Sequence, residues 1–142
     1  MKRLPLLLAP LLLIACSGGD AKVEPSTPAP AASKPAMTQM ERGAILWKRC
    51  RACHTLAEGE RHKVGPNLWG MFGQAAGARE DFNYSRAMAG SGIVWSDETL
   101  DAYLEKPNDY IPGNRMTYAG LRKAEDRAAV IAYLRAETGA SD

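Results

Sequence analysis

Residues 50–54 read Cys50-Arg51-Ala52-Cys53-His54, a Cys-x-x-Cys-His motif. This pattern is the signature of covalent c-type haem attachment, because two thiols on one helical turn can each add to a haem vinyl group. The adjacent histidine can then supply a ring nitrogen as an axial ligand of the iron. The motif therefore predicts a redox protein in which Cys50 and Cys53 attach the haem and His54 ligates it. A thiol-disulfide pair, half of a zinc site and a chance match are the alternatives.

The first sixteen residues have the composition of an export signal. Lys2 and Arg3 precede an apolar run over 4–14, and small Ala15 stands directly before Cys16. The run of about 11 apolar residues is shorter than the roughly 20 that a membrane-spanning helix needs, and two prolines interrupt it. The segment resembles the lipobox of bacterial lipoproteins, which implies removal of residues 1–15 and lipidation of Cys16. An ordinary secretory signal and an uncleaved anchor are the alternatives.

A composition change after Cys16 predicts a tether. Residues 17–36 are rich in proline, alanine, serine, glycine and lysine and contain no aromatic residue. Such a segment cannot bury a core, and its proline-rich part should extend by about 3.1 Å per residue. A lipid on Cys16 would then hold the following domain close to membrane-bound partners. We therefore divide the chain into a signal peptide (1–15), a lipidated N-terminus with a tether (16–36) and one small domain (37–142).

Three helices are predicted in this domain. Thr38-Gln39-Met40-Glu41 is a capping-box pattern and predicts a first helix that runs into the cysteine motif. Ser96 is suited to cap a middle helix that stops before Pro107. A last helix should end at Gly139 and pack against the first one. No convincing pair of alternating strands is present, so the predicted fold class is all-α.

Apolar residues at helical spacing should form the core-facing sides of these helices. They are Met40, Ala44 and Trp47 in the first helix, Leu100, Tyr103 and Leu104 in the middle helix, and Ala124, Ala128, Ile131 and Leu134 in the last.

The region from Thr55 to Trp95 is rich in glycine and is predicted to form long connections. Such connections are uncommon in a small domain unless they wrap a large apolar group that supplies the missing core. A flexible binding surface is the alternative, but the apolar side chains in this region argue against a solvated loop. They are Val64, Leu68, Trp69, Met71 and Phe72.

Met116 is the candidate for the second axial ligand. It follows a Pro-Gly turn in the segment 111–116, Ile-Pro-Gly-Asn-Arg-Met. A thioether is a neutral, soft donor that favours ferrous iron and raises the reduction potential relative to a second nitrogen ligand. Core filling is the alternative, because methionine more often serves that purpose.

Together, several motifs resemble the class I cytochrome c family of the mitochondrial and bacterial soluble type. Besides Cys-Arg-Ala-Cys-His-Thr, they are Val-Gly-Pro-Asn-Leu (64–68), Gly-Met-Phe-Gly (70–73), Tyr84-Ser85, Trp95 and the segment 111–116. The resemblance implies a small fold of helices and long loops wrapped around one covalent haem c. It also implies that Met116 is the distal ligand and that the Pro66 carbonyl accepts a hydrogen bond from His54 Nδ1.

The resemblance also implies roles for three aromatic residues and for the contact between the terminal helices. Tyr84 and Trp95 match positions that hydrogen-bond a haem propionate, and Tyr103 matches a position near the methionine sulfur. The residues that match the helix contact are Gly43, Trp47 and Tyr133. The chain departs from the family pattern at Gln74, Met88, Asn108 and Asp109.

The balance of charge does not indicate binding to nucleic acid. The chain has 18 basic and 16 acidic side chains, and removal of Lys2 and Arg3 with the signal leaves the two kinds equal in number. We expect a cluster of basic residues to border the exposed haem edge and to orient an acidic docking face. These residues are Arg49, Arg51, Arg61, Lys63, Arg115, Arg122 and Lys123.

The sequence thus predicts a one-electron carrier, not an enzyme, on the periplasmic side of a bacterial cell envelope. By resemblance, the donor is a quinol-oxidising cytochrome bc complex and the acceptor is a terminal oxidase or a periplasmic reductase. The alternative is a haem enzyme or sensor in which Met116 dissociates to open the iron. A thiol-disulfide oxidoreductase would need a βαβ pattern near the motif, and a zinc site would need more ligands than His62 adds.

Overall fold

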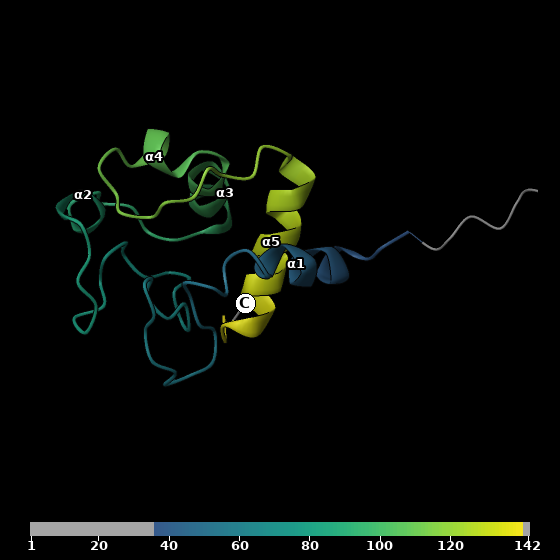
Figure 1. The fold of residues 1–142 in the computed structure, drawn as a ribbon, viewed down its shortest axis with the longest axis horizontal. Helices are drawn as coiled ribbons and strands as arrows, with labels where there is room; N and C mark the ends of the chain where they lie inside the picture. The colour runs from purple at the N-terminus through teal and green to yellow at the C-terminus, as the bar shows by residue number, and fades with distance from the viewer. Residues whose placement is uncertain (1–35, 141–142) are drawn as a thin grey trace, which may run out of the picture. The chain divides into compact units, whose positions relative to one another are not determined.

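The computed structural model describes residues 36–140, so the predictions for the signal peptide, Cys16 and the tether lie outside the described residues. The described part contains helices α1 (Gln39–Trp47), α2 (Arg86–Ala89), α3 (Asp97–Glu105), α4 (Pro107–Tyr110) and α5 (Ala124–Glu137), joined by long loops (Figure 1). Within this range there is no β-strand, and only two isolated bridges join loop residues. The all-α prediction is confirmed, and none of the described helices is long and apolar enough to cross a membrane.

Helix α1 begins where the sequence predicts. The Thr38 hydroxyl accepts a hydrogen bond from the Glu41 amide, and the Glu41 carboxylate accepts one from the Thr38 amide, which completes the capping box. The helix ends at Trp47, and hydrogen-bonded turns continue the chain into the cysteine motif. The local sequence therefore sets the direction in which the motif is presented.

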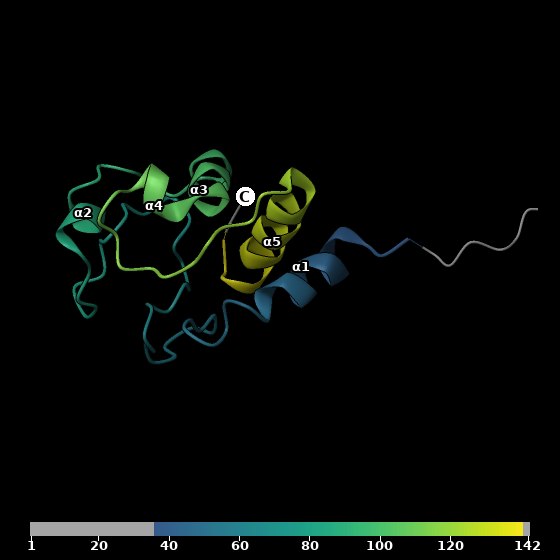
Figure 2. The same cartoon turned by 45° about the horizontal axis from the view of Figure 1, so that its top comes forward.

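Helices α1 and α5 cross in close contact, as Figures 1 and 2 both show. Gly43 lies at the crossing, where an added Cβ would be 2.3 Å from Ala129 O and 2.6 Å from Tyr133 Cβ. A side chain cannot fit there, so glycine allows the two backbones to approach. The predicted packing of the terminal helices, with Gly43 and Tyr133 in it, is confirmed.

The predicted apolar sides of α1 and α5 are partly wrong. Met40 is 42% exposed, and Ala124 and Ala128 are exposed as well. Helix α5 contacts α1 on one side and α3 on the other. Its buried face is therefore wider than one stripe and is turned away from the two alanines. It comprises Arg127, Ala129, Val130, Ile131 and Leu134.

Helix α3 agrees with its prediction and forms one side of the core. Ser96 caps its N-terminus, and Leu100, Tyr103 and Leu104 are buried along it. Arg127 of α5 fastens α3 from the other side, because its Nε donates to Asp101 Oδ1 at 2.8 Å. The single-turn helices α2 and α4 were not predicted, since one turn carries no periodic pattern.

Candidate cofactor site

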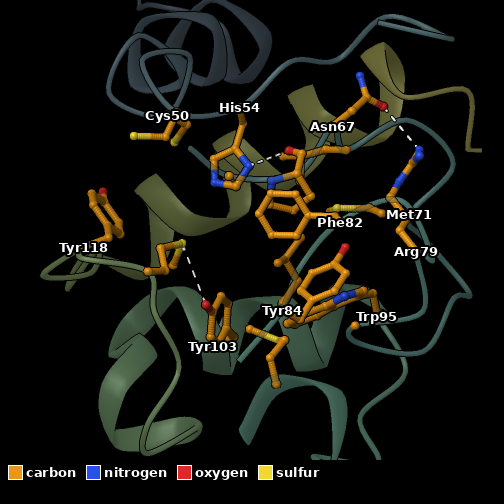
Figure 3. A pocket seen from close by; sticks show the side chains of 18 of the residues that line it. Cys50, His54, Asn67, Met71, Arg79, Phe82, Tyr84, Trp95, Tyr103 and Tyr118 are labelled. Carbon is orange, nitrogen blue, oxygen red and sulfur yellow. Dashed lines mark hydrogen bonds between the residues drawn. The ribbon is translucent and has the colours of Figure 1, made fainter. Parts of the chain in front are cut away.

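One cavity of about 760 Å³ is lined by the cysteine motif, the glycine-rich loops, α3, α5 and the segment between α4 and α5. Its volume lies within the range of roughly 300–1,000 Å³ that is typical of small-molecule and cofactor sites. All eight cofactor-site residues predicted from the sequence line it, namely Cys50, Cys53, His54, Pro66, Tyr84, Trp95, Tyr103 and Met116. Figure 3 labels five of them, Cys50, His54, Tyr84, Trp95 and Tyr103.

The two thiols reach the cavity from one helical turn. The amides of Cys53 and His54 both donate to the Cys50 carbonyl, at 2.9 and 3.0 Å, and both thiols are free. Burial raises the pKa of the Cys50 thiol above its usual value, although the nearby charge of Arg49 opposes this. Thiol-disulfide enzymes depend on a lowered thiol pKa, so the burial of Cys50 does not favour a thiol-disulfide pair.

His54 is held from two sides. Its Nδ1 donates to Pro66 O at 2.8 Å, which leaves Nε2 without a hydrogen-bond partner among the described residues (Figure 3). Gly65, the residue before Pro66, lies so close to the ring that an added Cβ would be 2.4 Å from His54 Cε1. Burial lowers the pKa of His54, while the Pro66 bond raises it and the charge of Lys63 lowers it further. The ring is therefore kept neutral, the form in which imidazole binds a metal.

Met116 lines the same cavity from the segment between α4 and α5. The Tyr103 hydroxyl lies 3.7 Å from Met116 Sδ and donates to it. Tyr103 is itself buried, and burial raises the pKa of its hydroxyl to about 12, so this donor keeps its proton at physiological pH. Met71 and Met88 also line the cavity, but no polar partner of either sulfur is recorded among the described residues.

Two further donors in the cavity have no protein partner in the described range. These are the Tyr84 hydroxyl and the Trp95 indole N–H, whose side chains lie beside each other in Figure 3. Phe82 packs edge-on against Tyr84 with ring centroids 4.8 Å apart, and Trp95 packs against Tyr103 at 5.1 Å. Both donors are thus fixed by aromatic packing and are available to an acceptor in the cavity.

Comparison with known proteins identifies the family. The sequence profile described as "Cytochrome c" matches residues 40–137. The chain is 48% identical over 99 residues to cytochrome c of Stellaria longipes, covering 69% of this chain and 92% of that protein. It is 52% identical over 95 residues to cytochrome c of Theileria parva (66% and 82% covered) and 44% identical over 96 residues to cytochrome c2 of Afifella marina (66% and 77% covered). The chain belongs to the cytochrome c family.

Family membership settles the cofactor and the class of function. A cytochrome c domain with two cysteines three positions apart binds haem c covalently. The family consists of electron carriers, not enzymes, and its partners are respiratory redox proteins. This cytochrome is therefore a monohaem electron carrier.

The cavity of this cytochrome fits a haem group. It offers two free thiols, a neutral imidazole with an unpartnered Nε2 and a predominantly apolar wall. The lining contains no acidic side chain among the described residues, whereas the haem carries two carboxylates. Of the basic cluster predicted at the haem edge, only Arg49 and Arg115 belong to the lining. Val64 also corrects a prediction, because it is 85% exposed although it borders the cavity.

Three residues of the site were missed from the sequence. Arg79 lines the cavity and donates to Asn67 Oδ1 and Trp69 O at 3.3 and 2.9 Å. Asn67 and Asn114 are polar residues in loops, yet they are 3% and 8% exposed and each makes several side-chain hydrogen bonds. The only sequence signals of a role were that Asn67 directly follows Pro66 and that Asn114 stands two residues before Met116.

Proposed function

We propose that this cytochrome is tethered to a bacterial membrane by a lipid on Cys16 and carries one electron at a time on a haem ligated by His54 and Met116. The observation that carries the ligand assignment is the meeting of these two side chains in one cavity with the two attachment cysteines. When bound, the haem supplies the Fe(III)/Fe(II) couple. The protein's task is then to hold both axial side chains in place, which keeps small ligands off the iron.

The hydrogen bonds of the two ligands support their roles. Pro66 O fixes the His54 ring and its tautomer, and such an outer bond increases the basicity of a ligating imidazole. Tyr103 donates to the Met116 sulfur, which draws electron density from the thioether and favours the reduced state. The unpartnered donors of Tyr84 and Trp95 are suited to hold a propionate carboxylate.

The lipobox-like sequence and the proline-rich segment before the domain support the tether. A tethered domain reaches successive partners in the same membrane at high effective concentration. We therefore propose a quinol-oxidising cytochrome bc complex as the donor and a terminal oxidase or a periplasmic reductase as the acceptor. Arg49 and Arg115 at the cavity wall are placed to attract an acidic partner surface.

The ligand assignment is tested by absorption spectra of the protein produced with c-type maturation machinery. We expect the unmodified protein to show the weak far-red band of an iron-thioether bond, and Met116→Ala to lose the band and bind added imidazole. Met71→Ala is the matched control, because it also removes a thioether from the cavity lining and should retain the band. Retention of the band in Met116→Ala would refute the assignment, and imidazole binding by the unmodified protein at low concentration would favour the sensor alternative.

The tether is tested by fractionating cells that produce the full chain or Cys16→Ser. The unmodified protein should sediment with membranes and be released by detergent. The Cys16→Ser protein should appear in the periplasmic fraction with an unchanged absorption spectrum, because residue 16 lies outside the matched domain. Equal distribution of both proteins would show that Cys16 does not anchor the chain.

A further inference from the structure

Asn114 has an unusual number of bonds for a loop residue next to the Met116 wall. Its Nδ2 lies 2.8 Å from Pro107 O, 2.9 Å from Ile111 O and 3.1 Å from Asn108 Oδ1, and its two N–H groups are shared among these three acceptors. Its Oδ1 accepts the Met116 amide at 2.8 Å and the Tyr103 hydroxyl at 3.4 Å. The side chain is buried, with 8% of the residue exposed. Both ends of the amide are therefore fully used.

The two bonds accepted by Asn114 Oδ1 both lead to Met116. One holds the Met116 backbone directly, as an asparagine does when it bonds the amide two residues further on. The other is with the Tyr103 hydroxyl, which also lies 3.7 Å from Met116 Sδ, so the two acceptors share its one proton. A single carbonyl oxygen thus contacts the Met116 backbone and the hydroxyl that lies beside the Met116 sulfur.

The contacts of Asn114 Nδ2 connect this side chain to α4 and to the residue that follows α4. Pro107 is the first residue of α4 and is almost fully buried. The residues from 112 to 119, in contrast, lie in neither a helix nor a strand, and most of them are exposed. Asn114 therefore connects the segment that bears Met116 to α4.

We infer that Asn114 is a positioning residue that holds Met116 in the place from which its sulfur ligates the haem iron. This inference rests on the proposed ligation by Met116. Without the Asn114 amide, the Met116 backbone loses the hydrogen bond that anchors it, and the Tyr103 hydroxyl loses one of its two acceptors. The thioether then competes less well with exogenous ligands.

The test compares three variants of the haem-loaded protein with the unmodified one. Asn114→Ala removes all five bonds. Asn114→Ser removes the bonds to α4 but keeps a hydroxyl that can accept the Met116 amide. Thr138→Ala is the matched control, because Thr138 is also buried and bonds Leu134 O at 2.7 Å but does not line the cavity. For each protein, urea unfolding, the far-red band and the affinity for imidazole are measured.

We expect Asn114→Ala to bind imidazole about tenfold more tightly than the unmodified protein, as the loss of a buried hydrogen bond implies, and to show a weaker far-red band. Asn114→Ser should remain within about threefold of the unmodified affinity, because it keeps the anchor of the Met116 backbone. Thr138→Ala should lower the urea midpoint without changing the band. If the alanine variant fails to fold, Asn114→Leu takes its place, because leucine has a volume similar to that of asparagine and also lacks both polar ends of the amide.

Two results would overturn the inference. One is an imidazole affinity of Asn114→Ala no higher than that of Thr138→Ala at a similar urea midpoint. The other is an equal loss of the band in Asn114→Ser and Asn114→Ala. Failure of the proposed function looks different, because the unmodified protein would then lack the far-red band, or Met116→Ala would retain it.

Discussion

The two walls of the haem cavity are built in different ways. On one wall, His54 follows directly after the attachment cysteines, and its ring is confined by Pro66 O at 2.8 Å and by Gly65. On the other wall, Met116 lies in a segment without helix or strand and is held by Asn114 and Tyr103. The position of His54 is thus determined by a short stretch of chain. The position of Met116 depends on bonds between separate segments. We therefore expect Met116 to lose its position before His54 does when the protein is destabilised.

The largest effect is expected where the His54 wall is tightest, in Gly65→Ala. The added methyl group would lie 2.4 Å from His54 Cε1, and the ring cannot move without breaking its bond to Pro66. We expect a loss of about 3 kcal/mol in stability, as for an overpacked core, together with poor haem incorporation. Haem yield per polypeptide and urea unfolding of the purified protein measure both.

Gly59→Ala is the control for this substitution. Gly59 has a φ of +67°, and an added Cβ meets nothing within 4 Å. It should cost about 1 kcal/mol for backbone strain alone and leave haem yield unchanged. If the two alanine variants behave alike, the close approach of Gly65 to His54 is not what confines the ring.

An intermediate loss of stability is expected for Arg127→Met, which acts where α5 contacts α3. The Arg127 side chain bonds Asp101 Oδ1 and the carbonyls of Leu121 and Arg122, and it fastens α3, which carries Tyr103, to α5. Its removal leaves buried carbonyls without a donor and should cost about 2–3 kcal/mol, with Asp101 adding little because it is partly exposed. Thermal unfolding measures this loss. If the far-red band weakens in parallel, the position of Met116 depends on the packing of α3 as well as on the segment 112–119.

The smallest effect is expected for Tyr103→Phe. This change removes only the hydroxyl that donates to Met116 Sδ and approaches Asn114 Oδ1. The reduced state should become less favourable by about 0.5–1 kcal/mol, because the thioether keeps more electron density. A potentiometric titration measures the change, with Tyr110→Phe on the exposed side of the same aromatic cluster as the control. An unchanged or raised potential would contradict this role of the hydroxyl.

The sequence was sufficient for features that depend on neighbouring residues. The capping residues Thr38 and Ser96 are placed as predicted, because a capping box is closed within four positions. The cysteine motif and Pro66 were also found, since each belongs to a short pattern with a fixed spacing. The whole predicted set of cofactor-site residues consequently lines one cavity.

Features that depend on packing between distant elements could not be predicted. The alanines of α5 fit an apolar stripe, yet contacts with two helices turn a different face inward. Arg127 is buried only because α3 brings Asp101 to it. Asn114 is polar and follows a turn, which predicts solvent exposure. Its burial follows from α4 and Tyr103 closing around it.

The crossing of α1 and α5 also joins the two ends of the domain. Arg42 and Asp126, which bond across this crossing, are 84 residues apart in sequence. A chain that is synthesised from its N-terminus cannot close the contact until its final helix has emerged. The haem-attachment motif directly follows α1, so α5, from the other end of the domain, must dock before the helix that leads into the motif is covered.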